Sequence, residues 1–216
     1  MPSKVTSVWL PQVLFESALI VVSILVALAL DEWRQNRQNA AVIRHALTSF
    51  LSEVQQNKIR VEDATPFNQG LRLVMNRHYI DDDIESVDEF VSMVETYSPV
   101  VLQSTAWETA LATGSLAKMD YNLVAALSLT YSLQNRYQLT SRTGFSELTS
   151  PQNLAQDKLK LAAYNSVRYL DNITSMETEL GVIYGEATIV IQAAIDAMDQ
   201  GVPMPGAPPV ADLEHP

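Results

Sequence analysis

One uninterrupted apolar run near the start of the chain constrains the fold more than any other feature of the sequence. Val13–Leu30 reads VLFESALIVVSILVALAL, and no charged residue occurs from Ser17 onward. A helix needs about 20 mainly apolar residues to cross the hydrocarbon core of a bilayer. The sequence therefore predicts a transmembrane helix over residues 12–33.

Tryptophans flank this run on both sides. Trp9 and Trp33 lie 24 residues apart, which is about 36 Å along an α-helix. Tryptophan is enriched at both membrane–water interfaces, so this spacing suits one aromatic ring at each surface of a bilayer. Residues 1–11 would form a short N-terminal tail.

Two other interpretations of the apolar run stay open. Ala27-Leu28-Ala29 has the small-x-small pattern of a cleavage site, so the run could be a signal peptide. Against cleavage, Lys4 is the only basic residue before the run, and the helical pattern continues past Ala29 without a breaker. The run could also be a buried core helix, because its fully uncharged part is short for a membrane span.

Glu16 lies between the two tryptophans, inside the predicted span. A carboxylate in a bilayer is costly without a partner, so an intramembrane acid is by default a functional candidate. Glu16 would then make a polar contact to another protomer or to a larger membrane complex. Alternatively, the helix lies lower in the bilayer and this side chain snorkels to the headgroups.

Basic residues next to the run bear on its orientation. Lys4 precedes the run, whereas Arg34, Arg37 and Arg44 follow it. Lys and Arg are in excess on the cytoplasmic side of membrane proteins, which would place the following domain in the cytoplasm. The difference in the number of basic residues between the two sides is small, so the side of the membrane on which the soluble domain lies stays undecided. The sequence predicts a single-pass protein of the bacterial inner membrane.

The helix should continue well beyond the membrane. Neither Pro nor Gly occurs from Gln12 to Thr65. An apolar stripe follows the span at steps of three, four and seven, formed by Ile43, Leu47, Phe50, Leu51, Val54 and Val61. We therefore predict one helix of about 50 residues, which Pro66 would end.

Capping and stop signals predict several shorter helices after this one. Ser86–Glu89 and Thr105–Glu108 are capping boxes, in which a hydroxyl and a carboxylate satisfy free backbone amides. The other expected features are a short helix over Phe67–Tyr79, a stop at Gly114, an N-cap at Asp120 and a stop at Gly144.

A second long helix should close the domain. Ser150-Pro151 combines a hydroxyl cap with proline at the first helical position, and Gly201 provides a stop. Between them, a heptad seam typical of a coiled coil is formed by Ile173, Met176, Leu180, Ile183, Ala187, Val190, Ala194 and Ala197. This helix should return antiparallel along the first.

Together these elements predict an all-α fold. The N-terminal transmembrane helix would be continuous with a long helix and lead into an elongated up-and-down helical bundle over residues 34–200, with several short helices inserted. Residues 201–216 contain five prolines and little periodicity, so we expect a disordered Pro-rich tail.

Two groups of residues are candidates for binding. Gly181 and Gly185 form a GxxxG pair, which permits close helix contact with a membrane or protein partner. The interpretation we favour is close packing of this helix on another within the bundle. A polar pocket between the short helices could be lined by Trp107, Glu108, Tyr131 and Arg136. For Glu108 we favour the capping role.

The sequence predicts no catalytic, metal or cofactor site. The chain has no cysteine, which excludes disulfides, thiolate metal sites and cysteine nucleophiles. His45, His78 and His215 lie far apart, and no phosphate-binding glycine loop or nucleophile elbow occurs. A formal net charge of −11 opposes nucleic-acid binding. We therefore expect neither an enzyme nor a nucleic-acid-binding protein.

Two segments resemble a family of uncharacterised bacterial single-span membrane proteins. Ala18–Gln38, ALIVVSILVALALDEWRQNRQ, is similar to the start of that family, in which an apolar span ends in Asp-x-Trp. Gln103–Tyr137 resembles its second recurring feature: a short helix with an aromatic residue, a small-residue stop and a helix ending in Tyr. The resemblance implies a membrane-anchored helical domain and no assigned activity.

These features favour an interaction protein. We expect a membrane-anchored scaffold or accessory subunit of a membrane complex, whose partners are the lipid bilayer and either copies of itself or another membrane protein. The alternative is a sensory or ligand-binding bundle that transmits a signal along its long helices. The chain carries no recognisable output domain, which weakens that alternative, whereas a defined polar pocket would favour it.

Overall fold

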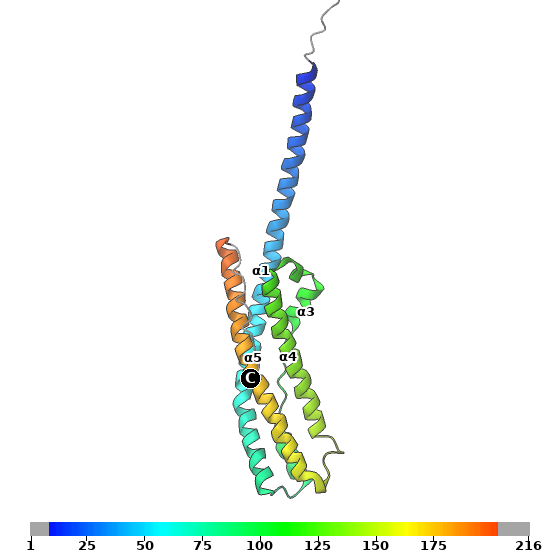
Figure 1. The fold of residues 1–216 in the computed structure, drawn as a ribbon, viewed down its shortest axis with the longest axis vertical. Coiled ribbons are helices and arrows are strands. Elements are labelled where there is room, and N and C mark those ends of the chain that lie inside the picture. The colour runs from blue at the N-terminus through cyan, green and yellow to red at the C-terminus, as the bar shows by residue number, and fades with distance from the viewer. Residues whose placement is uncertain (1–8, 203–216) are drawn as a thin grey trace, which may run out of the picture. The chain divides into compact units, whose positions relative to one another are not determined.

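The structure is a computed structural model that describes residues 9–202, with side chains from Phe15 onward. The helices are α1 (Trp9–Asp81), α2 (Val87–Val94), α3 (Thr105–Ala112), α4 (Tyr121–Leu148) and α5 (Leu159–Gln200), with short 3₁₀ helices η1 (Ser115–Lys118) and η2 (Gln156–Lys158) (Figure 1). No strand occurs in the described range, so the predicted all-α class is confirmed. The tails at residues 1–8 and 203–216, and the side chain of Trp9, lie outside it.

The chain divides into two compact units after Ile43, and each is described by itself. In the first unit, every side chain from Phe15 to Gln38 is exposed. The ten large apolar side chains between Phe15 and Leu30 are each 53–68% exposed, and they lie on all sides of the helix. Ser23 donates its hydroxyl to the Leu19 carbonyl at 2.7 Å, which satisfies that polar group within the helix itself.

Among the described residues, one helical stretch is long and apolar enough to cross a membrane by length and composition, Gln156–Gln200. Its most apolar window is 44% buried inside the protein. The core helix of a soluble bundle has the same length and composition, and α5 carries the buried seam of the second unit. The transmembrane nature of the run at Phe15–Leu30 stays a prediction.

Pro66 does not end the first long helix, so that prediction is wrong. α1 contains Pro66 and continues to Asp81, and it absorbs the separate helix expected over Phe67–Tyr79. Proline lacks the N–H that would bond the carbonyl four residues earlier, so it usually breaks a helix interior. Packing on both sides of the proline outweighs this loss in α1.

The residues around Pro66 show how the helix is held. Val61, five residues before the proline, and Asn68, two residues after it, are each 1% exposed or less. The Thr65 hydroxyl donates to the Val61 carbonyl at 2.8 Å. The Glu62 carbonyl is the acceptor that loses its helical donor to the proline.

The second unit is a bundle in which α5 returns antiparallel along residues 44–81 of α1, as predicted. The direction follows from pairs whose residue numbers rise on α1 and fall on α5: Arg44 with Asp199 at 2.8 Å, Asn68 with Glu177 at 2.7 Å and Arg72 with Asp171 at 2.8 Å. Figure 1 shows α4 beside α5. The predicted seam of α5 is confirmed, since all its members are buried except the half-buried Val190.

Local signals predict several helix ends correctly. Asp120 caps α4 by accepting the amides of Asn122 and Leu123. Gly114 and Gly201 both have φ of 67°, a left-handed conformation that glycine adopts without strain. Beyond Gly201, the Val202 amide bonds the Ala197 carbonyl at 3.0 Å, which closes α5 as a Schellman motif.

Ser150-Pro151 does not start the last helix, and that prediction is wrong. The Asn153 amide bonds the Ser150 carbonyl at 2.9 Å, which makes a four-residue turn with proline at its second position. The Ser150 hydroxyl donates to the Gln152 side chain instead of capping a helix. α5 begins later, at Leu159.

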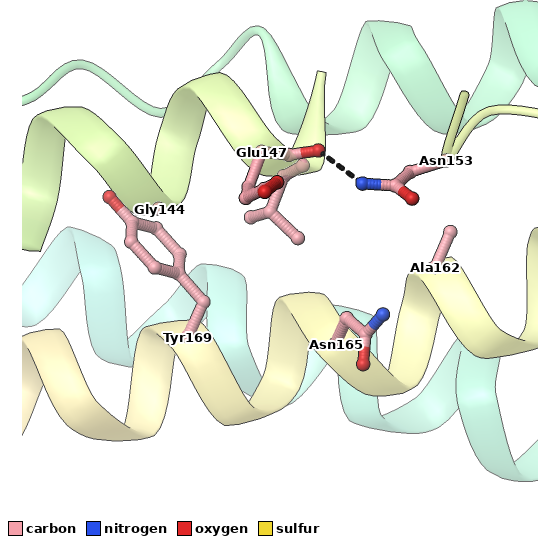
Figure 2. Close-up of a pocket in the computed structure, with 7 residues that line it drawn as sticks. Gly144, Glu147, Asn153, Ala162, Asn165 and Tyr169 are labelled. Carbon is pink, nitrogen blue, oxygen red and sulfur yellow. Dashed lines mark hydrogen bonds between the residues drawn. The ribbon is translucent and has the colours of Figure 1, made fainter. Parts of the chain in front are cut away.

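Gly144 does not end α4, which continues to Leu148, so this prediction is also wrong. A Cβ at Gly144 would overlap the ring carbons Cε2 and Cδ2 of Tyr169. Figure 2 shows the Tyr169 ring lying against α4 at this glycine, at one side of a pocket of about 320 Å³. The Tyr169 hydroxyl donates to the Ser141 carbonyl at 2.8 Å, which fixes the ring there.

Two glycine-to-alanine substitutions should therefore have opposite effects. Gly144→Ala should lower the free energy of unfolding by about 1–2 kcal/mol, because overpacking against Tyr169 exceeds the gain in helix propensity. Gly181→Ala should raise it by about 1 kcal/mol, because its Cβ meets no atom within 4 Å. Thermal unfolding followed by circular dichroism measures both. Equal effects of the two substitutions would contradict the close approach at Gly144.

Candidate functional site

The segment between α2 and α3 is bonded to side chains from both α1 and α4. Asn57 on α1 pairs with the backbone of Gln103 twice: its Nδ2 donates to the carbonyl at 2.7 Å and its Oδ1 accepts the amide at 2.9 Å. On the other side, Gln134 and Gln138 of α4 donate to the Gln103 and Leu102 carbonyls at 2.8 and 2.9 Å. Distant side chains therefore satisfy the backbone polar groups at Leu102 and Gln103 of this linker.

The amides of Asn57 and Gln134 also bond each other at 3.1 Å. The same Gln134 oxygen accepts the hydroxyl of Tyr184 from α5 at 2.8 Å. All three side chains are 1% exposed or less. A fully satisfied buried network of this kind fixes one relative register of α1, α4, α5 and the linker.

Glu53 on α1 caps α3 from a distance. Its Oε2 accepts the amide of Ala106, in the first turn of α3, at 2.9 Å, and its Oε1 accepts the hydroxyl of Tyr131 at 2.7 Å. A carboxylate at a helix N-terminus also interacts favourably with the helix dipole. Burial, followed by the hydrogen bond to Glu53, raises the pKa of Tyr131, so its hydroxyl remains a donor.

The capping box predicted at Thr105–Glu108 is not formed, so that prediction is wrong. The N-cap residue is Ser104, which makes no side-chain bond to a backbone amide of the helix. Its hydroxyl donates to the exposed Glu108 carboxylate instead. The capping function belongs to Glu53, 53 positions before Ala106 in the sequence.

The structure brings together only part of the predicted pocket. Trp107 and Tyr131 stack with ring centroids 5.4 Å apart, and Phe50 packs against both. Arg136 is exposed and pairs with Glu179 at 2.8 Å. Trp107 and Tyr131 therefore belong to an aromatic cluster that contacts Glu53 through the Tyr131 hydroxyl.

A second buried carboxylate lies one layer further along the bundle. Glu177 of α5 is 1% exposed. Its Oε1 accepts the Asn68 amide at 2.7 Å and the Tyr137 hydroxyl at 2.9 Å. Its Oε2 is buried without a hydrogen-bond partner among the described residues. Burial raises the pKa of Glu177, and the hydrogen-bonding side chains of Tyr137, Asn68 and Thr65 partly oppose this.

This raised pKa predicts a pH dependence of stability. Between the ordinary glutamate pKa of 4.5 and its raised value, the folded state holds a proton that the unfolded state has lost. Stability from this group is therefore full below pH 4.5 and falls as the pH rises, by at most about 1.4 kcal/mol per unit. Glu177→Gln should remove this loss, and exposed Glu186→Gln should not. The free energy of unfolding of the three proteins should be measured from pH 4 to pH 8. The same pH dependence in all three proteins would contradict the prediction.

An open groove of about 450 Å³ lies beside Glu177, between α1 and α5. Its lining residues are Lys58, Val61, Glu62, Thr65, Pro66, Glu177, Thr178, Gly181 and Val182. A Cβ at Gly181 would meet no atom within 4 Å, and one at Gly185 would meet only the Lys58 side chain at 4.0 Å. The close packing within the bundle that we favoured for this pair is therefore wrong. A contact of the pair with a membrane or partner stays a prediction.

Four buried polar residues were not predicted from the sequence: Glu53, Asn57, Asn68 and Glu177. A signal was present, because each falls in phase with an apolar stripe. Asn57 follows Val54 by three residues and precedes Val61 by four. A polar residue at such a position is buried and must be hydrogen-bonded. Its partner, however, cannot be read from the stripe.

Glu16, the remaining predicted contact residue, is exposed on α1 in the first unit. Within residues 9–202, no group of three or more His, Cys, Asp or Glu side chains is arranged to hold a metal ion. In comparisons with known proteins, no family model, no curated protein and no solved structure matches the chain.

Proposed function

We propose that the chain is a membrane-anchored helical interaction protein, a scaffold or accessory subunit of a complex in the bacterial inner membrane. The observation that carries this proposal is the helix from Phe15 to Leu30, which has exposed apolar side chains on every side. A helix that is hydrophobic all round is normally covered by lipid or by protein. The resemblance of Ala18–Gln38 to single-span membrane proteins supports the membrane anchor.

The energetics favour lipid over water for this helix. Burial of a large apolar side chain gains about 1.5–3 kcal/mol when complete, and each of the ten in the run is more than half exposed. The gain is of order 10 kcal/mol in total. Glu16 costs about 3 kcal/mol at the centre of a bilayer and less nearer the headgroups. The balance favours insertion.

The bundle supplies a surface suited to a protein partner. Val182 and Ile189 of α5 are 57% and 70% exposed, and they lie on the same face as Gly181 and Gly185 because residues seven and four apart share a helix face. Glycines let another helix approach closely. We propose this face and Glu16 as contacts to a second copy or to another membrane protein.

Membrane fractionation tests the anchor. The full chain should stay with bacterial membranes after an alkaline carbonate wash, and its intact mass should include the residues before Ala29. Val22→Arg with Leu25→Arg should release it, because each arginine costs about 3 kcal/mol in the bilayer centre. The matched control is Val182→Arg with Ile189→Arg, which should remain bound. A wild-type protein that washes off, or one cleaved after Ala29, would contradict the anchor.

Crosslinking with mass spectrometry in native membranes tests the interaction. Wild type should yield crosslinks to one partner, and Glu16→Leu or Gly185→Leu should weaken them. A wild type that crosslinks to nothing, including itself, would leave only the sensory or ligand-binding alternative. The observation that favours this alternative is the groove beside Glu177.

A further inference from the structure

Two hydrogen-bond acceptors belong to residues of the groove between α1 and α5 and differ from the other acceptors in their donors. One is Oε2 of Glu177, which is buried and unpartnered among the described residues. The other is the Glu62 carbonyl, which lacks its usual helical donor because residue 66 is proline. Both residues line the groove. A buried acceptor without a donor costs about 1–3 kcal/mol, and more when it is charged.

The nearby cation does not compensate Glu177. Lys58 lines the same groove, but its Nζ lies 2.7 Å from Oε1 of Glu62, in an ion pair between adjacent turns of α1. Asn68 and Tyr137 both donate to Oε1 of Glu177 and leave Oε2 free. The carboxylate is therefore held in position by neutral donors, and Glu177 lines the groove without a counterion of its own.

The walls of the groove suit a short aliphatic chain. Val61, Pro66 and Val182 contribute apolar surface, and Gly181 leaves space where any other residue would place a side chain. The volume of about 450 Å³ accommodates several methylene groups and remains open to solvent. A ligand that fits would combine an apolar stem with a donor at its end.

We propose that this groove binds an alkylammonium group, with Glu177 as its counterion and the Glu62 carbonyl as a second acceptor. An ammonium offers three donors and a positive charge in a compact head. A hydrogen bond between charged groups is about twice as strong as one between neutral groups. The stem would lie over Gly181. Such a group occurs in free amines and in lysine side chains, and the proposal holds whether or not the chain is anchored in a membrane.

The test uses the full chain in lipid nanodiscs with ¹³C-labelled valine methyl groups. Titration with putrescine, and separately with N-acetyl-lysine-N-methylamide, should shift the Val61 and Val182 methyl signals. The signal of Val202, about 30 Å further along α5 from Val182, should stay unchanged. A response to putrescine alone identifies a free amine as the source, and a response to the lysine derivative alone identifies a protein side chain. No saturable shift with either probe would overturn the proposal.

Variants separate binding at the carboxylate from nonspecific attraction to an acidic protein. Glu177→Gln should weaken binding at least 10-fold, because it removes the charge and replaces an acceptor by a donor. Gly181→Leu should weaken it similarly by filling the groove without touching the carboxylate. Glu186→Gln, which removes an exposed charge from the same helix, should leave the affinity unchanged. Equal affinity in Glu177→Gln and wild type would also overturn the proposal.

Discussion

Replacement of Asn57 by alanine should destabilise the bundle by about 3 kcal/mol, the largest effect we expect from a single residue. The substitution removes both hydrogen bonds to Gln103 and the one to Gln134. The part-buried Gln103 amide then loses its partner, and this loss adds to the cost of the cavity left by the fully buried Asn57 side chain, about 1–3 kcal/mol for each. The midpoint of thermal unfolding should fall by roughly 6–12 °C.

Gln56 provides the matched control for this prediction. It is exposed on α1 beside Asn57, and its amide bonds only the Ser52 hydroxyl of the preceding turn, at 3.2 Å. Gln56→Ala should change the stability by less than about 0.5 kcal/mol. If both alanine variants unfold at the same temperature, the linker is not held by Asn57.

Glu53→Ala should cost nearly as much as Asn57→Ala, about 3 kcal/mol, because it leaves two donors without an acceptor. These are the Tyr131 hydroxyl and the Ala106 amide, and hydrogen bonds to a charged group contribute about 1.5–3 kcal/mol each. Glu53→Gln should cost only about 1 kcal/mol. A glutamine oxygen can accept the amide while its NH₂ donates to the rotated tyrosine hydroxyl, so mainly the interaction with the helix dipole is lost.

Glu108→Ala decides which carboxylate caps α3. Glu108 is exposed and bonds Ser104, so its loss should change the free energy of unfolding by less than about 0.5 kcal/mol. Urea unfolding of the three variants in detergent micelles gives the comparison. A larger effect of Glu108→Ala than of Glu53→Ala would restore the capping box expected from the sequence.

The boundaries that could be predicted from the sequence depend on chemistry within a few residues. Asp120 and Gly201 were found because the amides and carbonyls they satisfy are their near neighbours. The seam of α5 was found because one period repeats over many turns. For these features, the residues that form the recognisable pattern are also the residues whose interactions produce the structure.

The features that were missed have their causes elsewhere in the chain. Thr105–Glu108 fits a capping box, but α3 has Ser104 as its N-cap, so the Glu108 amide bonds the Ser104 carbonyl, while Glu53 accepts the Ala106 amide. Pro66 is a strong local stop, but packing of α1 on α5 carries the helix through it. Gly144 and Gly181 are both glycines within a helical sequence pattern, yet only Gly144 packs against an aromatic ring. No local pattern distinguishes these cases, because the deciding atoms lie on a different helix.

The attachment of the linker before α3 has a consequence for the folding pathway. Asn57 must find Gln103, 46 residues away, and Gln134, 77 residues away, whereas helices form from contacts within a few residues. Contacts between such distant residues slow folding, because the loop between them must be closed before they form. α1, α4 and α5 should therefore be helical early, and the rate-limiting step should be the ordering of this linker between them. Substitutions at Asn57 should then slow refolding, whereas those at exposed helix positions should leave its rate unchanged.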